Sequence, residues 1–178
     1  MAVVSHHTMS LDGFVAGPDD TMDWVSGHGR ATDLAERTRS RIDAIVAGRR
    51  WHDLALDRGN GVDGIYGGAF EGPVFVVSHR PPPGDVDPRV TFVTGLDDAL
   101  AAAGRAAGEG DVAVFGGSLT RQCAAKGVLD EVVVHLVPVL LGGGVRLYGE
   151  DGDPTVRLER VECAPAEQIT DLRFRVVC

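Results

Sequence analysis

The decisive stretch of this sequence is Asp111-Val-Ala-Val-Phe115, followed by Gly116-Gly117-Ser118 and then by Leu119-Thr-Arg-Gln-Cys-Ala-Ala-Lys126. It predicts an apolar strand, a glycine turn and a helix in direct succession. Two glycines let the backbone approach a ligand, and the unpaired N–H groups of a helix start attract anions. Ser118 stands at the expected N-cap, where its hydroxyl would cap the helix or bind a phosphate oxygen. The alternative is a plain tight bend, so other segments must decide.

Short β-branched runs alternate with helix-like segments along the chain, which predicts a three-layer α/β/α sandwich. Several strands are apolar nearly throughout, as in a mostly parallel sheet covered on both faces, and the last two form an antiparallel hairpin. The expected strands are Ala2–Thr8, Ala44–Ala47, Val74–Ser78, Thr91–Val93, Val112–Phe115, Glu131–Val137, Val156–Ala164 and Gln168–Val177. The expected helices are Ala31–Arg41, Trp51–Leu56, Leu96–Gly104 and Leu119–Lys126.

Length and charge bound the class of protein. A chain of 178 residues with 44% hydrophobic positions suits one domain, residues 1–178. The formal net charge of −9 disfavours nucleic acid as a partner. The N-terminus has no secretory pattern, and the longest apolar run, Val132–Leu141, is too short to cross a bilayer, so we expect a cytoplasmic protein without a membrane partner.

Cysteines and histidines give no metal pattern. Three widely spaced cysteines, Cys123, Cys163 and Cys178, argue against a disulfide framework or a zinc cluster, and we expect them in packing roles, with Cys178 as a candidate exposed thiol. His6 and His7 are adjacent on a strand and point to opposite faces. His135, among valines, is expected to be a hydrogen-bonded core or interface residue. No metal site is predicted.

Four loops follow strand ends and carry groups suited to a dinucleotide: Ser10–Gly17, Gly48–Trp51, Ser78–Arg80 and Gly116–Ser118. Ligands of open α/β sheets bind beyond the carboxyl ends of the strands, so these loops are expected to converge on one crevice. Arginine forks bind phosphates, and no acidic residue stands where a free ribose 2′-hydroxyl would need one. This pattern favours NADPH over NADH.

The motifs together resemble the dihydrofolate reductase-like superfamily, in particular the reductase domain of the bifunctional deaminase-reductase of riboflavin biosynthesis. The resemblance runs from Val3 to Val177. The segments that carry it are Met9-Ser-Leu-Asp-Gly-Phe-Val-Ala-Gly-Pro18, Gly48-Arg49-Arg50, Pro73-Val-Phe-Val-Val-Ser-His79, Phe115-Gly-Gly-Ser118 and the run from Gly127 to Leu147.

This resemblance implies an NADPH-dependent reductase that forms a homodimer and acts on a small heterocyclic or ribosylated substrate, as in the reduction of 5-amino-6-(5-phosphoribosylamino)uracil. It implies phosphate contacts from Gly48, Arg49 and Arg50, and places Ser78 and His79 near the adenosine end. The pyrophosphate would lie on the segment formed by Gly116, Gly117, Ser118, Leu119 and Thr120.

Two carboxylates are candidates for the chemistry. Hydride transfer to a C=N or C=O group needs mainly placement, with a proton from a nearby group. Asp12 is the first candidate to contact the substrate or orient the reacting centre, and an Asx turn before Gly13 is the alternative. Asp33 is the second, because Thr32-Asp-Leu-Ala35 resembles the helix that presents the substrate carboxylate in dihydrofolate reductases. A solvated acid in a first helical turn is equally open.

The sequence also departs from the bifunctional enzyme, since it lacks the H-x-E and P-C-x-x-C signature of the zinc deaminase. A role in riboflavin synthesis is therefore left open. Pterin reduction is a competing reading that depends on Asp33. A third reading, from a different class, is an NADPH-binding sensor module without catalysis.

Overall fold

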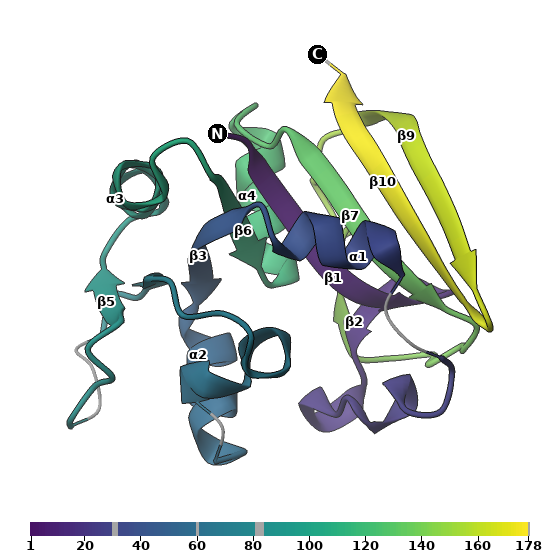
Figure 1. Cartoon of the computed structure of the whole chain (residues 1–178), viewed down its shortest axis with the longest axis horizontal. Helices are drawn as coiled ribbons and strands as arrows, with labels where there is room; N and C mark the ends of the chain where they lie inside the picture. The colour runs from purple at the N-terminus through teal and green to yellow at the C-terminus, as the bar shows by residue number, and fades with distance from the viewer. Residues whose placement is uncertain (30–31, 60, 81–83, 178) are drawn as a thin grey trace.

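The computed structural model describes residues 1–29, 32–59, 61–80 and 84–177, and within them one sheet organises the chain (Figure 1). Its eight strands lie in the order β5-β4-β3-β6-β1-β7-β10-β9. Their bounds are β1 Val3–Ser10, β3 Ile42–Gly48, β4 Val74–Val77, β5 Val90–Val93, β6 Asp111–Phe115, β7 Glu131–Val137, β9 Arg157–Ala166 and β10 Ile169–Val177. Both ends of the chain thus contribute strands to the same sheet.

The strand directions confirm the expected mixture of parallel and antiparallel pairing. β1 pairs in parallel with both β6 and β7, and β3 pairs in parallel with β4 and β6. β10 runs antiparallel to β7 and forms a hairpin with β9, with a register shift between Arg173 and Phe174. The parallel strands therefore end together at one edge of the sheet.

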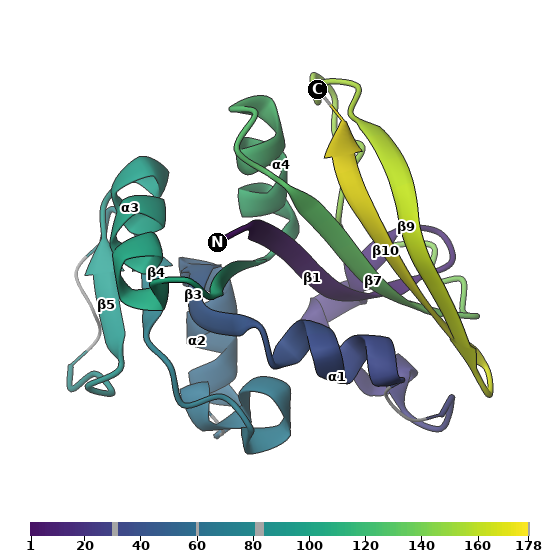
Figure 2. The same cartoon turned by 45° about the horizontal axis from the view of Figure 1, so that its top comes forward.

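Helices cover both faces of this sheet, which confirms the three-layer arrangement (Figure 2). On the first face, α3 and α4 pack against the sheet in one core cluster. On the second face, the 3₁₀ helix η3 and Trp51 of α2 pack against the sheet in the other cluster. Helix α1 lies on the side of β7, β10 and β9, where Thr32 bonds Asp171 and Arg37 pairs with Glu162. The bounds are α1 Asp33–Arg39, α2 Arg49–Asp57, η3 Gly61–Gly68, α3 Leu96–Ala107 and α4 Gly117–Ala125.

Two helices begin earlier than the sequence indicated. α2 begins at Arg49 rather than Trp51, and α4 begins at Gly117 rather than Leu119. Gly116 is therefore the N-cap of α4, and the expectation that Ser118 caps this helix is wrong. The Ser118 hydroxyl instead accepts a hydrogen bond from Gln122 one turn along. The expected start of the first helix at Ala31 lies outside the described residues.

Other departures concern short or isolated features. The strands β2 (Phe14–Ala16) and β8 (Val145–Arg146) pair with each other, although neither was among the expected strands and β2 lies within the expected loop Ser10–Gly17. They are too short to show a period of two in the sequence. Cys123 is buried as expected, whereas Cys163 is exposed, so its expected packing role is wrong. Cys178 lies outside the described residues.

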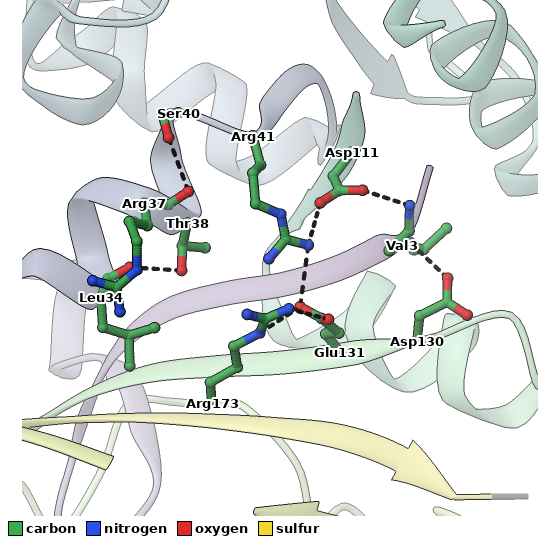
Figure 3. A network of polar contacts seen from close by, with 11 residues as sticks. Val3, Leu34, Arg37, Thr38, Ser40, Arg41, Asp111, Asp130, Glu131 and Arg173 are labelled. Atoms are coloured by element: carbon green, nitrogen blue, oxygen red, sulfur yellow. Dashed lines mark hydrogen bonds and ion pairs between the residues drawn. The ribbon is translucent and has the colours of Figure 1, made fainter. Parts of the chain in front are cut away.

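An ionic network ties the amino ends of the strands together (Figure 3). Arg41, just before β3, pairs with Asp111 at the start of β6 and reaches Glu131 at the start of β7. Arg173 of β10 makes two hydrogen bonds to Glu131, at 3.0 and 2.5 Å. The network lies at the amino edge of the parallel strands, and the antiparallel β10 reaches it with its carboxyl half. Ligands of such sheets bind at the opposite edge, beyond the carboxyl ends of the parallel strands.

None of the described helices is long and apolar enough to cross a membrane.

A substitution at Gly117 tests the close approach of α4 to β8. A Cβ at this position would lie 2.1 Å from the backbone carbonyl oxygen of Arg146, so Gly117→Ala must displace β8 or the helix start. We expect urea unfolding to show a loss of roughly 1–3 kcal/mol, the usual cost of overpacking. The control is Ser118→Ala, the next residue of the same helix, which should change stability little. Equal stability of the Gly117 variant and the natural protein would contradict this packing.

Candidate functional site

The larger of two neighbouring cavities opens at the carboxyl edge of the sheet and has a volume of about 360 Å³. The carboxyl half of β1, the ends of β3 and β6, and the short strands β2 and β8 surround it. The lining residues that matter below are His6, His7, Thr8, Asp20, Gly48, Arg50, Trp51, Arg58, Phe115, Gly116, Gly117, Ser118 and Leu119. Three of the four predicted loops thus converge here. The fourth, Ser78–Arg80, is not part of this lining.

Two helices begin at this cavity without a side-chain cap. Gly48 is the N-cap of α2 and Gly116 the N-cap of α4, and neither helix start receives a capping hydrogen bond from a side chain. Gly116 has φ of 101°, a conformation that favours glycine and turns the chain from β6 into the helix. The first-turn N–H groups and the helix dipoles therefore favour an anion in this cavity.

A loop residue, Asp20, lies against the cationic side of the cavity. Arg50 lines the cavity, is 72% exposed at its side chain, and pairs with the Asp20 carboxylate at 2.7 Å. Arg58 donates a hydrogen bond to the Asp20 backbone carbonyl. Both arginines thus line the cavity, and Asp20 accepts from Arg50 through its carboxylate and from Arg58 through its backbone carbonyl.

The remaining predicted cofactor residues lie beside this lining. Arg49 bonds Asp53, lies 3.4 Å from the Ser78 hydroxyl and stacks over Phe92. Ser78 is buried and its hydroxyl bonds Arg80, whereas His79 is exposed. Their predicted cofactor roles stay predictions.

Thr120 is nearly fully buried beneath the start of α4. Its hydroxyl lies 3.0 Å from that of Ser5 and 3.2 Å from the Gly116 carbonyl oxygen, so it ties the helix to β1. Gly116, Gly117, Ser118 and Leu119 line the larger cavity, but Thr120 does not. Any effect of Thr120 on a ligand would therefore pass through the helix start or through His7, whose Nε2 lies 3.4 Å from the Thr120 hydroxyl.

Asp12 holds a turn in place. Its carboxylate accepts hydrogen bonds from the Ser10 hydroxyl at 2.6 Å and from the backbone N–H groups of Leu141 and Gly142. These hydrogen bonds, the one from Ser10 first, lower the pKa of Asp12 to about 2. The carboxylate does not line either cavity. Its geometry is that of a structural anion, and its predicted catalytic role stays a prediction.

Asp33 lies in the first turn of α1 and is exposed. It lines neither cavity. On the same helix Glu36 and Arg39 line the smaller cavity and pair with each other. The predicted substrate contact of Asp33 has no geometric support, because a residue three positions further along is the one that faces the space beside β1.

The smaller cavity, of about 290 Å³, shares a wall with the larger one. It is lined by His6, His7, Thr8, Ala35, Glu36, Arg39, Tyr66 and His135. Its first three residues also line the larger cavity, so the carboxyl half of β1 lies between the two spaces. Phe115 of the larger cavity contacts the Tyr66 ring at 5.8 Å between centroids. Two ligands bound in these cavities would meet at β1.

Histidines that the sequence analysis set aside form the shared wall. His135 is hydrogen-bonded, as predicted, but its partners, His6 and Asp171, were missed. Asp171 is 1% exposed on β10. A lone acid within the alternating strand Ile169–Val177 was the available signal, and only strand pairing shows which residue faces it, because Asp171 pairs with His135 across β7 and β10.

Burial controls the charge state of this wall. It lowers the pKa of His6 well below the usual range, with further contributions from His135 and His7. Burial, followed by the neighbouring His135, lowers the pKa of His7 to about 4. Burial also raises the pKa of Tyr66. At Asp171 burial opposes ionisation, but hydrogen bonds from His135 and Thr32 outweigh it and lower the pKa.

Comparison with known proteins identifies the family. The model of the RibD C-terminal domain matches residues 1–170. The chain belongs to the RibD C-terminal domain family. A protein of Shewanella sp. PV-4 described as a riboflavin biosynthesis protein shares 25% identity with a TM-score of 0.82, and each chain covers 100% of the other. No curated protein sequence matches this member of the family.

Two more distant structures share the fold of this RibD C-terminal domain. A pyrimidine reductase-like protein of Corynebacterium diphtheriae is 16% identical with a TM-score of 0.65, over 99% of this chain and 92% of that one. The deaminase/5-amino-6-(5-phosphoribosylamino)uracil reductase of Thermotoga maritima is 13% identical with a TM-score of 0.65, over 99% of this chain. The match covers 56% of the Thermotoga chain, so this chain spans about half of that protein. Family and neighbours together support a reductase of the riboflavin-biosynthesis type.

His7 makes the stability of this RibD-type domain depend on pH. The unfolded chain binds a proton at His7 near pH 6.5, but the folded chain binds it only near pH 4. Between these values the unfolded state holds more protons, so stability falls as the pH falls. The natural protein should lose free energy of unfolding when the pH is lowered from 7.5 to 4.5. In His7→Gln this loss should be smaller by about 1–3 kcal/mol. Urea titrations at both pH values measure this, with the exposed His79→Gln as control. An identical pH dependence in both variants would contradict the assignment.

Proposed function

We propose that this chain is an NADPH-dependent reductase that transfers hydride to a C=N or C=O group of a phosphoribosylaminopyrimidine. One observation carries the proposal: two cavities share the wall His6–Thr8, and only the larger one has two uncapped helix starts. An anionic cofactor suits the larger cavity and an uncharged ring suits the smaller one. Hydride transfer requires donor and acceptor atoms to be held in contact, which a shared wall favours.

The cofactor would lie across the starts of both helices. In this proposal the backbone at Gly116 and Gly117, with Ser118, binds the pyrophosphate, and Gly48 and Arg50 bind a second phosphate. Arg49, Ser78 and His79 lie beside this lining and would bind the adenosine end. When bound, the reduced nicotinamide supplies the hydride, and the chain's own residues position it and exclude water.

The substrate would enter the smaller cavity beside α1. Glu36 and Arg39 at its rim provide one acceptor and one fork of donors, which suits a polar pyrimidine with a phosphorylated sugar. Pterin reduction depended on Asp33, which is exposed and outside both cavities. A binding module without catalysis needs only one cavity, so the presence of a second one at the shared wall favours the reductase.

Cofactor binding is tested by titration with NADPH and NADH. We expect NADPH to bind more tightly than NADH. Binding is measured by quenching of the fluorescence of Trp51, which lines the larger cavity. Arg50→Ala should weaken NADPH binding by roughly 10- to 100-fold, the effect of a lost charge-assisted hydrogen bond. Arg105→Ala, an exposed arginine of α3, is the matched control. No binding of either nucleotide would refute the proposal, and binding without oxidation of NADPH by any pyrimidine or pterin would favour the sensor reading.

The Asp20 carboxylate should compete with the cofactor for Arg50. Asp20→Ala removes the carboxylate that pairs with Arg50 and keeps the backbone carbonyl that accepts from Arg58, so we expect NADPH to bind several-fold more tightly, a gain of about 1 kcal/mol. Calorimetric titration at low and high salt measures the change. Asp19→Ala, the exposed neighbouring acid, is the control. Weaker binding in the Asp20 variant would show that its carboxylate helps to form the site.

We also propose that the protein forms a homodimer through the free edge of β9. This strand exposes Leu158 and Val161, and its charged residues alternate in sign along Arg157–Glu162. An antiparallel copy would match opposite charges and cover the apolar side chains. Light scattering after gel filtration should give twice the monomer mass of 18.8 kDa, and Val161→Lys should give the monomer. A monomeric natural protein would refute the dimer.

A further inference from the structure

A continuous chain of hydrogen bonds runs through the wall between the two cavities. The Tyr66 hydroxyl lies 2.8 Å from Nδ1 of His6, and Nε2 of His6 lies 2.6 Å from Nε2 of His135. Nδ1 of His135 lies 2.7 Å from Oδ1 of Asp171. The Thr32 hydroxyl donates to Oδ2 of the same carboxylate at 2.5 Å. One residue each from η3, β1, β7 and β10, with Thr32 at the N-cap of α1, thus forms an unbroken path.

The partners determine where the protons lie. An ionised Asp171 accepts from the Thr32 hydroxyl and from Nδ1–H of His135. A neutral His135 then has only Nε2 as an acceptor, so His6 donates from its own Nε2–H. His6 is left with an unprotonated Nδ1, which accepts from the Tyr66 hydroxyl. In this resting state every link has one donor and one acceptor.

One added proton reverses the direction of the chain. When His135 carries a second proton on Nε2, it donates to Nε2 of His6, and His6 must then carry its proton on Nδ1 and donate to the Tyr66 oxygen. The Tyr66 O–H is thereby released toward the smaller cavity, which this residue lines. Asp171 stabilises the imidazolium, as a buried carboxylate does beside other catalytic histidines. The loaded chain therefore presents a proton at Tyr66.

The backbone at Tyr66 is itself unusual. Tyr66 has φ of 52° and ψ of 35°, a left-handed conformation that bulky residues rarely adopt, and it precedes two glycines with positive φ. Such a conformation costs about 1–3 kcal/mol and persists where the surroundings hold it. Here the surroundings are the bond to His6 and ring contacts with Phe70 and Phe115. In this conformation Tyr66 lines the smaller cavity, and its hydroxyl lies against His6.

We infer that the chain Tyr66–His6–His135–Asp171 is a proton relay whose terminal donor, Tyr66, protonates the substrate as hydride arrives. The inference rests on the proposed reductase function and adds a proton source to it. Tyr66 is the catalytic residue because it would touch the substrate. His6, His135 and Asp171 act through it. The sequence had pointed to Asp12 and Asp33 as the candidates for the chemistry and had identified no proton donor.

The step balances in atoms and charge. Hydride from the reduced nicotinamide forms the new C–H bond, and the electron pair of the C=N or C=O bond moves to nitrogen or oxygen. That atom takes the proton of Tyr66, Tyr66 takes Nδ1–H of His6, and His6 takes Nε2–H of His135. The tyrosine is never left as a phenolate, which suits its buried surroundings. The relay ends in its resting state, and water reloads it at His135, which also lines the smaller cavity.

Charged and titratable neighbours surround the relay on each side. His7 of β1 lies beside His6 and is neutral near pH 7, because burial holds its pKa at about 4. From α1, Glu36 and Arg39 line the same cavity and pair with each other. Asp171 is the anion facing the histidines from β10. The charge of the added proton is therefore balanced by Asp171 from within the wall.

The resting state is tested without substrate or cofactor. In protein labelled with ¹⁵N at histidine, NMR at pH 8 should find the proton of His6 on Nε2 and that of His135 on Nδ1. Lowering the pH should protonate the two rings as one coupled unit. A His6 proton on Nδ1 at pH 8, or two independent titrations near pH 6.5, would overturn the relay. His52→Gln, a buried histidine outside both cavities, assigns its own signal and should leave the others unchanged.

The catalytic part is tested by single-turnover oxidation of NADPH. Tyr66→Phe retains the ring and removes the donor, so we expect the rate constant to fall about 10²- to 10⁴-fold, with substrate and NADPH affinity changed by less than about threefold. Tyr148→Phe is the matched control, because its hydroxyl bonds the Pro154 carbonyl on an exposed loop. An unchanged rate constant in Tyr66→Phe would overturn the proposal.

The pH profile distinguishes a relay from a structural role. The natural protein should slow as the pH rises and the added proton is lost. Tyr66→Phe should lose this inflection, and Asp171→Asn should shift it to lower pH because the imidazolium loses its counter-ion. Unshifted inflections in both variants would contradict the relay. If the natural protein binds no NADPH, the reductase proposal fails instead, and the NMR result still decides whether the hydrogen-bond chain exists.

Discussion

Parallel pairing of β1 with both β6 and β7 is the constraint on which the rest of the structure depends. It places β1 in the middle of the sheet, with its carboxyl half between two cavities. Because the strands are parallel, the turns that follow β3 and β6 open at the same edge as the end of β1. Every candidate functional group on the shared wall owes its position to this pairing.

The two edges of the sheet have different physical roles. At the amino edge, Arg41, Asp111, Glu131 and Arg173 satisfy one another across four strands. At the carboxyl edge, two helices begin without side-chain caps, and residues at both helix starts line a cavity. Charges that stabilise the fold are thus separated from groups that remain available to an anion. Because the ion pairs lie at the amino edge, a ligand at the carboxyl edge can use the polar groups there without breaking those pairs.

The wall between the cavities contains polar groups that would be costly if left unpaired. His6 and Asp171 are both buried, and each makes two hydrogen bonds to other side chains. Within the described part of the chain, no buried side-chain nitrogen or oxygen lacks a partner. Thr32 extends the same path to the start of α1, where it also caps the helix. The position of α1 beside the smaller cavity is therefore tied to the polar wall.

Sequence alone determined the alternation of strands and helices, because the spacing of apolar residues and the positions of glycine turns are local properties of the chain. It also indicated the glycine turn at Gly116 and the arginine pair after Gly48, since phosphate-binding backbone follows strand ends in this class of fold. It was wrong about the cap at Ser118, because Gly117 already adopts the helical conformation. The short strands β2 and β8 were missed because their pairing joins residues far apart in the chain.

Only the tertiary structure decided which polar residues meet. His6, Tyr66, His135 and Asp171 are separated by 36 to 129 positions along their hydrogen-bonded links, and no local pattern relates them. Likewise, nothing in the sequence around Asp12 shows that its carboxylate holds the turn at Leu141 and Gly142. Strand order and register bring such groups together, and these depend on packing across the whole sheet. The sequence therefore determined the elements and the edge at which a ligand is expected, and the tertiary structure decided which polar groups meet between the two cavities.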